Sequence, residues 1–205
     1  MVVKNIILDM LPEIWPMLLF VSVVAVSLRW AYLHNNGKKL VFYRELMALV
    51  FILYILCLYY ILTYRDAGIS GINFIPFREI FRYKIGSYKF MKNVAGNTLL
   101  FLPFGFFSAY YVDTKKIGAP VIVALIVSLC AEAMQYYLGR VFDIDDVILN
   151  VVGGFLGYLL FVAFSAVRGK LPKFMKSDGF LNFLVITIVV LIILYSMGIN
   201  ILELF

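Results

Sequence analysis

Charged side chains are scarce in this sequence, and their scarcity excludes an ordinary soluble protein. Asp, Glu, Lys and Arg make up 15% of the 205 residues, whereas hydrophobic residues make up 64%. A typical soluble domain is about a quarter charged. The mean hydropathy of +0.98 points the same way. The composition therefore predicts a single integral membrane domain over residues 1–205, with no room for a separate soluble domain.

Cysteine and histidine are nearly absent, which limits the chemistry open to this chain. Cys57 and Cys130 both lie within apolar runs, so neither a disulfide framework nor a thiol metal cluster is supported. The single histidine, His34, follows the first apolar run and is interpreted as a loop residue. Because no nucleophile is paired with a base in the sequence, an enzyme is the less favoured class.

Positive charge is in excess, with a formal net charge of +6, but it does not indicate nucleic acid binding. The basic residues lie in short loops between apolar runs. We interpret them as topology signals and as contacts with anionic lipid headgroups.

Long apolar runs fill most of the chain and predict an all-α membrane protein with about six transmembrane helices. Residues 46–64, for example, form 19 consecutive uncharged residues, about the length needed to cross roughly 30 Å of hydrocarbon. Pro103, followed by Gly105, is expected to kink or break the third span. Gly153 and Gly157 are interpreted as packing residues in the fifth span. The predicted spans are 14–33, 46–64, 93–112, 117–138, 147–167 and 179–202.

The connection between spans two and three is long, basic and partly apolar. Its apolar residues recur at helical spacing from Phe77 to Met91, with Lys and Arg largely between them. This pattern predicts a basic amphipathic helix in the headgroup plane or a short re-entrant element. Gly86 disfavours one continuous helix, and a solvated cationic loop is the alternative.

Polar residues concentrate near the fourth and fifth spans and in the short acidic loop between them. Carboxylates within or beside a membrane are costly, so they mark a functional site by default. Alternation of six spans places these residues, with others near the start of span three and in the preceding loop, on one membrane face, which we call the motif face. Its predicted ligand-binding residues are Asn73, Asn93, Asn97, Glu132, Gln135, Arg140, Asp143, Asp145, Asp146 and Asn150.

The distribution of basic residues predicts the orientation of the motif face. Ten of the eighteen Lys and Arg residues lie at or after the ends of spans one, three and five. The positive-inside rule puts those ends in the cytoplasm and the motif face outside. The six basic residues between 65 and 92 argue the other way, although an interfacial helix need not obey a rule made for loops.

Three stretches together resemble the VanZ-like family of bacterial membrane proteins. They are INFIPF, NVAGNTLLFLPFGFF and AEAMQYYLGRVFDIDDVILNVVGGFLGY, and the resemblance covers about residues 73–158. It implies a multi-pass protein of the bacterial cell membrane. The founding member of that family is associated with resistance to teicoplanin, a phenotype that does not define a reaction.

Each polar residue of the motif face also has a structural interpretation. Asp145 or Asp146 can cap the fifth helix, and the amides can bond between helices. Glu132 is expected to interact with Arg140, directly or through the loop carboxylates, or to pair with a basic residue of the loop between spans two and three. Arg, several carboxylates and amides on one face exceed what these roles need, so we favour a site.

Three functional classes follow for this site. The first is binding or transport of an amphiphilic envelope molecule, such as a lipid-linked or lipid-tailed glycoconjugate or glycopeptide, alongside ordinary membrane lipids. The second is a membrane enzyme acting on a phosphate-containing polyprenyl or glycolipid, with Glu132, Asp145 or Asp146 as catalytic candidates. No cofactor is predicted, but Asp143, Asp145 and Asp146 leave a divalent cation open. The third is a purely structural membrane partner.

Overall fold

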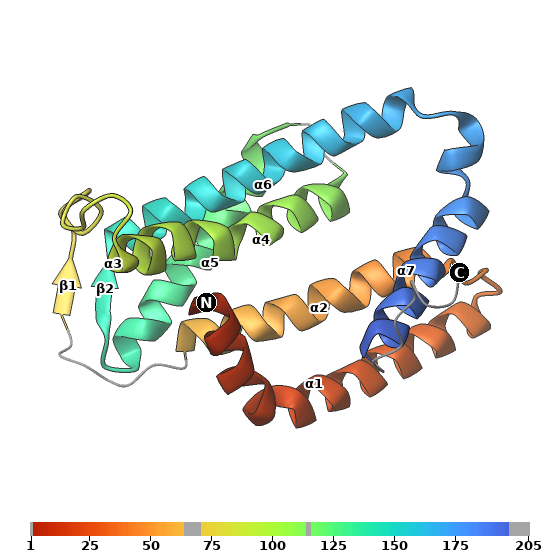
Figure 1. Cartoon of the computed structure of the whole chain (residues 1–205), viewed down its shortest axis with the longest axis horizontal. Coiled ribbons are helices and arrows are strands. Elements are labelled where there is room, and N and C mark those ends of the chain that lie inside the picture. The colour runs from red at the N-terminus through yellow and green to blue at the C-terminus, as the bar shows by residue number, and fades with distance from the viewer. Residues whose placement is uncertain (1, 64–70, 114–115, 197–205) are drawn as a thin grey trace. The chain divides into compact units, whose positions relative to one another are not determined.

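The computed structural model describes residues 2–63, 71–113 and 116–196, with the backbone alone for residues 2–9. Long helices dominate it (Figure 1). They are α1 (Val2–Asn35), α2 (Phe42–Thr63), α4 (Gly96–Val112), α5 (Gly118–Tyr137), α6 (Ile144–Lys170) and α7 (Asp178–Ser196).

The predicted all-α membrane fold is confirmed. Among the described residues, five helices are long and apolar enough to cross a membrane, namely all of those named except α4. The third predicted span corresponds to α4, which has 17 residues and follows directly on a π-helical turn, η1 (Met91–Ala95).

Prolines interrupt neither α1 nor α4. Helix α1 begins at Val2, well before the predicted start at Ile14, so Pro12 and Pro16 lie inside it. Helix α4 continues through Pro103 to Val112, so the span is not broken at this proline, and a kink there stays a prediction.

The chain divides into two compact units, which we describe separately. Unit 1 comprises residues 1–16 and 53–166, and unit 2 comprises residues 17–52 and 167–205. All ten predicted residues of the motif face belong to unit 1.

Glycines let α4 and α6 approach closely in unit 1. A Cβ atom added to Gly157 would lie 1.9 Å from the carbonyl oxygen of Leu102, and one added to Gly153 would lie 2.1 Å from that of Thr98. Gly105 of α4 is equally tight, because its Cβ would lie 1.9 Å from the carbonyl oxygen of Gly154. Small residues permit such helix contacts in membranes, so the predicted packing role is confirmed.

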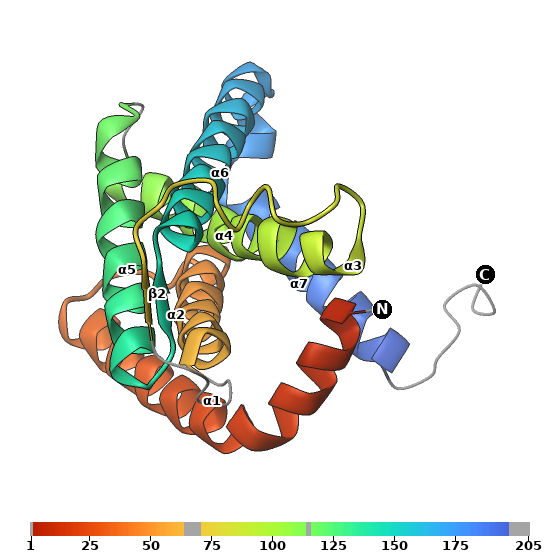
Figure 2. The ribbon, with the colours of Figure 1, turned by 90° about the vertical axis from the view of Figure 1, so that its left-hand side faces the viewer.

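A glycine turn ends α5 and directs the chain into a short strand. Gly139 has a φ of +82°, which glycine adopts at low cost. The N–H of Gly139 donates to the carbonyl of Tyr136, and that of Arg140 donates to the carbonyl of Gln135, the two bonds of a Schellman cap. Strand β2 (Val141–Asp143) then runs beside α5 (Figure 2).

Strand β2 pairs in parallel with β1 (Gly71–Asn73), a contact that our sequence analysis misses. The register aligns Gly71 with Val141 and Asn73 with Asp143. The pairing brings the loop after span two against the acidic loop.

The chain after β1 folds back in a series of turns as far as α3 (Tyr88–Phe90). A continuous helix over this segment is therefore wrong, and the re-entrant element and the solvated loop stay predictions. Phe77 and Gly86 have φ values of +67° and +79°, outside the helical region. We refer below to residues 74–92 as the interfacial segment.

Polar contacts tie the helices of unit 2 together. Arg29 of α1 pairs with Glu45 of α2, with Nε 2.6 Å from the carboxylate. The side-chain oxygen of Asn182 accepts from the N–H of Tyr43 at 2.9 Å, which joins α2 to α7.

Candidate functional site

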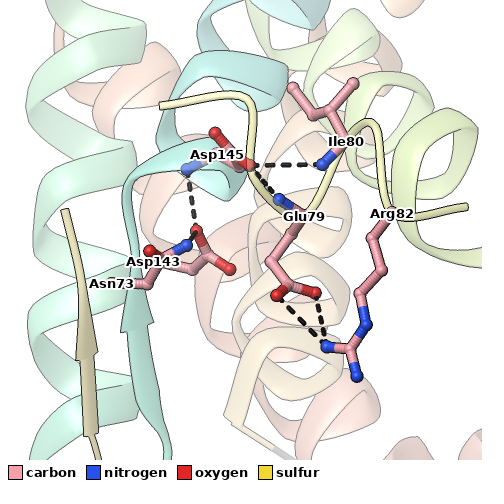
Figure 3. A network of polar contacts seen from close by, with 6 residues as sticks. All are labelled: Asn73, Glu79, Ile80, Arg82, Asp143 and Asp145. Atoms are coloured by element: carbon pink, nitrogen blue, oxygen red, sulfur yellow. Dashed lines mark hydrogen bonds and ion pairs between the residues drawn. The ribbon is translucent and has the colours of Figure 1, made fainter. Parts of the chain in front are cut away.

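Asp145 anchors the interfacial segment from the first turn of α6. It is 1% exposed. Its Oδ1 accepts from the N–H of Phe77. Its Oδ2 accepts from the N–H groups of Glu79 at 2.6 Å and Ile80 at 3.2 Å (Figure 3). Bonds from N–H groups to a carboxylate are stronger than bonds between neutral groups. These contacts hold the turn that contains the left-handed Phe77.

Asp143 caps α6 and joins the two strands. Its Oδ1 accepts from the N–H of Asp145 at 2.9 Å and from Nδ2 of Asn73 at 3.0 Å (Figure 3). The prediction that Asp145 or Asp146 caps this helix is therefore wrong, because the helix begins at Ile144 and Asp143 stands in the capping position. Burial raises the pKa of the Asp143 carboxyl, and the two hydrogen bonds oppose that rise.

Glu132 connects α5 to strand β2. It is 1% exposed, and its Oε2 accepts from the N–H of Asp143 at 3.1 Å. Nη1 of Arg140 donates to the carbonyl of Leu62 in α2 at 2.8 Å. A direct interaction of Glu132 with Arg140 stays a prediction.

Two of the predicted amides bond between helices. Nδ2 of Asn150 donates to Oγ of Ser128 at 2.9 Å, inside the contact of α6 with α5. Nδ2 of Asn97 donates to Oδ1 of Asp146, which joins α4 to α6. The interhelical role is confirmed for Asn97 and Asn150, whereas Asn93 lies half-buried in η1.

Gln135 carries an unsatisfied polar atom. Its side chain is 3% exposed, and its Oε1 is buried with no hydrogen-bond partner among the described residues. Most buried polar atoms in proteins are hydrogen-bonded. This oxygen can accept a hydrogen bond from a bound molecule.

Together these contacts form one polar framework at one end of the α4–α5–α6 bundle. The hydrogen bonds given above connect Asn73, Glu132, Asp143 and Asp145 with one another. The pairs Asn97–Asp146 and Asn150–Ser128 are separate bonds between the helices of the same bundle. These side chains can be picked out from the sequence, but the partners of Asp145 cannot, because they are the backbone N–H groups of residues 77, 79 and 80, and every residue except proline carries such a group.

The arrangement gives no support to a three-carboxylate cation site. Within the part of the chain that the structure describes, no group of three or more His, Cys, Asp or Glu side chains is placed to hold a metal ion. Both oxygens of Asp145 already accept backbone N–H bonds, with which a cation would compete.

The interfacial segment presents apolar and basic side chains outward from this framework. Phe81 and Ile85 are 80% and 84% exposed, and Phe74 is 66% exposed. A recess of about 460 Å³ opens among Phe77, Arg78, Glu79, Phe81 and Arg82. The exposed basic residues of the segment are Arg78, Arg82, Lys84, Lys89 and Lys92.

Comparison with known proteins agrees with a multi-pass membrane protein. The family model described as VanZ/LLP1 matches residues 51–165, so the chain belongs to the VanZ/LLP1 family. The match includes both strands, the interfacial segment and most of α6.

A particular relative is similar over most of its length. The chain is 29% identical to Protein VanZ of Enterococcus faecium over 153 residues, which are 73% of this chain and 86% of that protein. No solved structure gives a significant match.

Proposed function

We propose that the motif face binds the polar, anionic head of an amphiphilic cell-envelope molecule, with the interfacial segment as the contact surface. The observation that carries the proposal is the anchoring of this segment by Asp145, which accepts backbone N–H bonds from Phe77, Glu79 and Ile80. The buried carboxylate of Asp145 thus fixes the conformation of this segment.

The side chains of the segment match an amphiphile in both parts. Exposed aromatic and aliphatic groups such as Phe81 and Ile85 suit the boundary between headgroups and acyl chains. Arg82 pairs with Glu79 at 3.0 Å, whereas Arg78 and Lys84 have no acidic partner among the described residues and face outward. Guanidinium and ammonium groups bind phosphate and carboxylate.

The polar framework holds the interfacial segment in one conformation. A site whose groups are already held in place loses less conformational freedom on binding. The turn around Phe77 stays in a left-handed conformation because Asp145 holds its N–H, and the adjacent strand is held by Asn73 and Asp143. The segment is therefore ready to bind and needs no folding step.

In this proposal the motif face is on the extracytoplasmic side of the bacterial cell membrane, where lipid-linked glycoconjugates and lipid-tailed glycopeptides are present. A contribution to teicoplanin-type resistance would follow from capture of such a molecule. A metal-assisted lipid enzyme is less well supported, because the carboxylate oxygens of Asp145 serve the fold.

Native mass spectrometry of the detergent-purified protein tests the proposal, with a polyprenyl monophosphate as the probe. We expect the double variant Arg78→Gln/Lys84→Gln to bind the probe about 30-fold more weakly, since each basic group near a membrane surface contributes about 1 kcal/mol. The control is Lys170→Gln/Lys173→Gln, which removes the same charge from unit 2. An equal loss of affinity in both double variants would mean that the probe binds only through non-specific attraction to positive charge, and this would contradict the proposal.

A further inference from the structure

Unit 2 contains an apolar cavity that the framework does not use. It has a volume of about 660 Å³ and lies between the second half of α1 and the first half of α2. Typical ligand sites occupy about 300–1,000 Å³. Its walls are almost entirely aliphatic and aromatic, with Val21, Ala25, Leu46, Ala48 and Leu49 among them.

Basic side chains lie at and near one end of the cavity. Arg29 and Glu45, which pair across α1 and α2, belong to its lining. The Tyr32 ring lies 5.3 Å from the guanidinium of Arg29 and 5.0 Å from Nζ of Lys38, and Nζ of Lys38 donates to the Tyr32 hydroxyl at 2.8 Å. Lys38 and its neighbour Lys39 are exposed and have no acidic partner among the described residues.

We propose that this cavity holds an acyl chain of an anionic phospholipid, whose phosphate lies beside Lys38. Interiors of proteins are close-packed, so an apolar space of this size between two membrane helices is filled by a matching apolar group. Bulk lipid tails are as apolar as the cavity wall. Selectivity therefore comes from the headgroup, and the exposed Lys38 and Lys39 favour an anionic one.

The charged end distinguishes a lipid from a helix of a second copy. A helix would fill the cavity through shape alone and would gain nothing from Lys38 and Lys39. An anionic phospholipid uses both the apolar walls and the positive end. This site shares no residue with the motif face, so it stands or falls independently of the proposed function.

Trp30 lines the cavity and reports on its contents. The chain has two tryptophans, so Trp15→Phe leaves Trp30 as the single emitter. The protein is reconstituted in phosphatidylcholine vesicles to which brominated phosphatidylglycerol or brominated phosphatidylcholine is added, and quenching is measured against mole fraction. We expect the anionic lipid to quench with a relative binding constant at least about fivefold higher, the effect of one basic group near a membrane surface.

Two variants and one control complete the test in the same Trp15→Phe background. Lys38→Gln, at an exposed position, should lower the preference for the anionic lipid about fivefold. Ala25→Phe, which fills the cavity, should remove that preference, whereas Val23→Phe, exposed outside the lining, should leave it unchanged. Equal quenching by both lipids would overturn the proposal, as would a dimer in which neither lipid reaches Trp30.

Discussion

Replacement of Asp145 by Asn tests the contact that anchors the interfacial segment to α6. The carboxylate is 1% exposed and accepts from three backbone N–H groups, one at Oδ1 and two at Oδ2. Asparagine offers one oxygen. With that oxygen toward Glu79 and Ile80, its NH₂ group faces the N–H of Phe77, and in the flipped orientation two N–H groups lose their acceptor.

The structure sets the size of the effect. Losing one hydrogen bond to a charged acceptor costs about 1.5–3 kcal/mol, and the two remaining bonds weaken because the acceptor is neutral, so the segment loses about 2–4 kcal/mol of local stability. If trypsin cleaves only the opened segment, cleavage should accelerate by about 30- to 1,000-fold. Arg78, Arg82 and Lys84 provide the cleavage sites.

The assay is limited trypsin digestion of the purified protein, with the first cut mapped by mass spectrometry. Asp146→Asn is the matched control, because the amide oxygen can still accept from Nδ2 of Asn97. That variant should differ from wild type by less than about 1 kcal/mol. Wild-type cleavage rates in Asp145→Asn, or equal acceleration in both variants, would refute the role assigned to Asp145.

Three further predictions concern Asp143, the glycines and the orientation. Burial raises the pKa of Asp143, so ionisation of this carboxyl disfavours the folded state. Wild type should therefore lose thermal stability relative to Asp143→Asn as pH rises above the ordinary carboxyl pKa of about 4. A difference in melting temperature that does not change with pH would contradict this. Gly157→Ala should destabilise the protein by about 1–3 kcal/mol because its Cβ would meet the Leu102 carbonyl oxygen, whereas Gly169→Ala, with nothing within 4 Å, should not. Tyr137→Cys, made after the native cysteines are replaced, should react with an impermeant thiol reagent on intact cells, and labelling only after lysis would reverse the orientation.

The sequence predicts the parts of this fold that depend on residue type and spacing. Apolar runs give the helices, because a membrane helix needs a long uncharged stretch. Gly153 and Gly157 indicate the close contact of α6 with its neighbour, which the structure places against α4. Intramembrane polar residues such as Glu132 indicate the region of the site, because a polar group buried in a membrane is unfavourable unless it has hydrogen-bond or charged partners.

The remaining features depend on tertiary contacts that no local pattern shows. Strands β1 and β2 have three residues each and pair across about seventy positions of sequence, too short for any periodicity. Asp143 caps α6 because the helix begins before the first apolar residue of the predicted span. Phe77 has a left-handed backbone, rare for a bulky residue, and its N–H is held by Asp145, a residue 68 positions later in the chain.

Photocrosslinking tests the central claim most directly. A polyprenyl monophosphate with a photoreactive group beside the phosphate is added to the full-length protein in nanodiscs, and the labelled peptides are mapped. The account predicts labelling concentrated in residues 74–92, reduced by Arg78→Gln/Lys84→Gln and not by Lys170→Gln/Lys173→Gln. Labelling spread over all loops, or unchanged by the first pair of substitutions, would contradict the assignment of the interfacial segment as the binding surface.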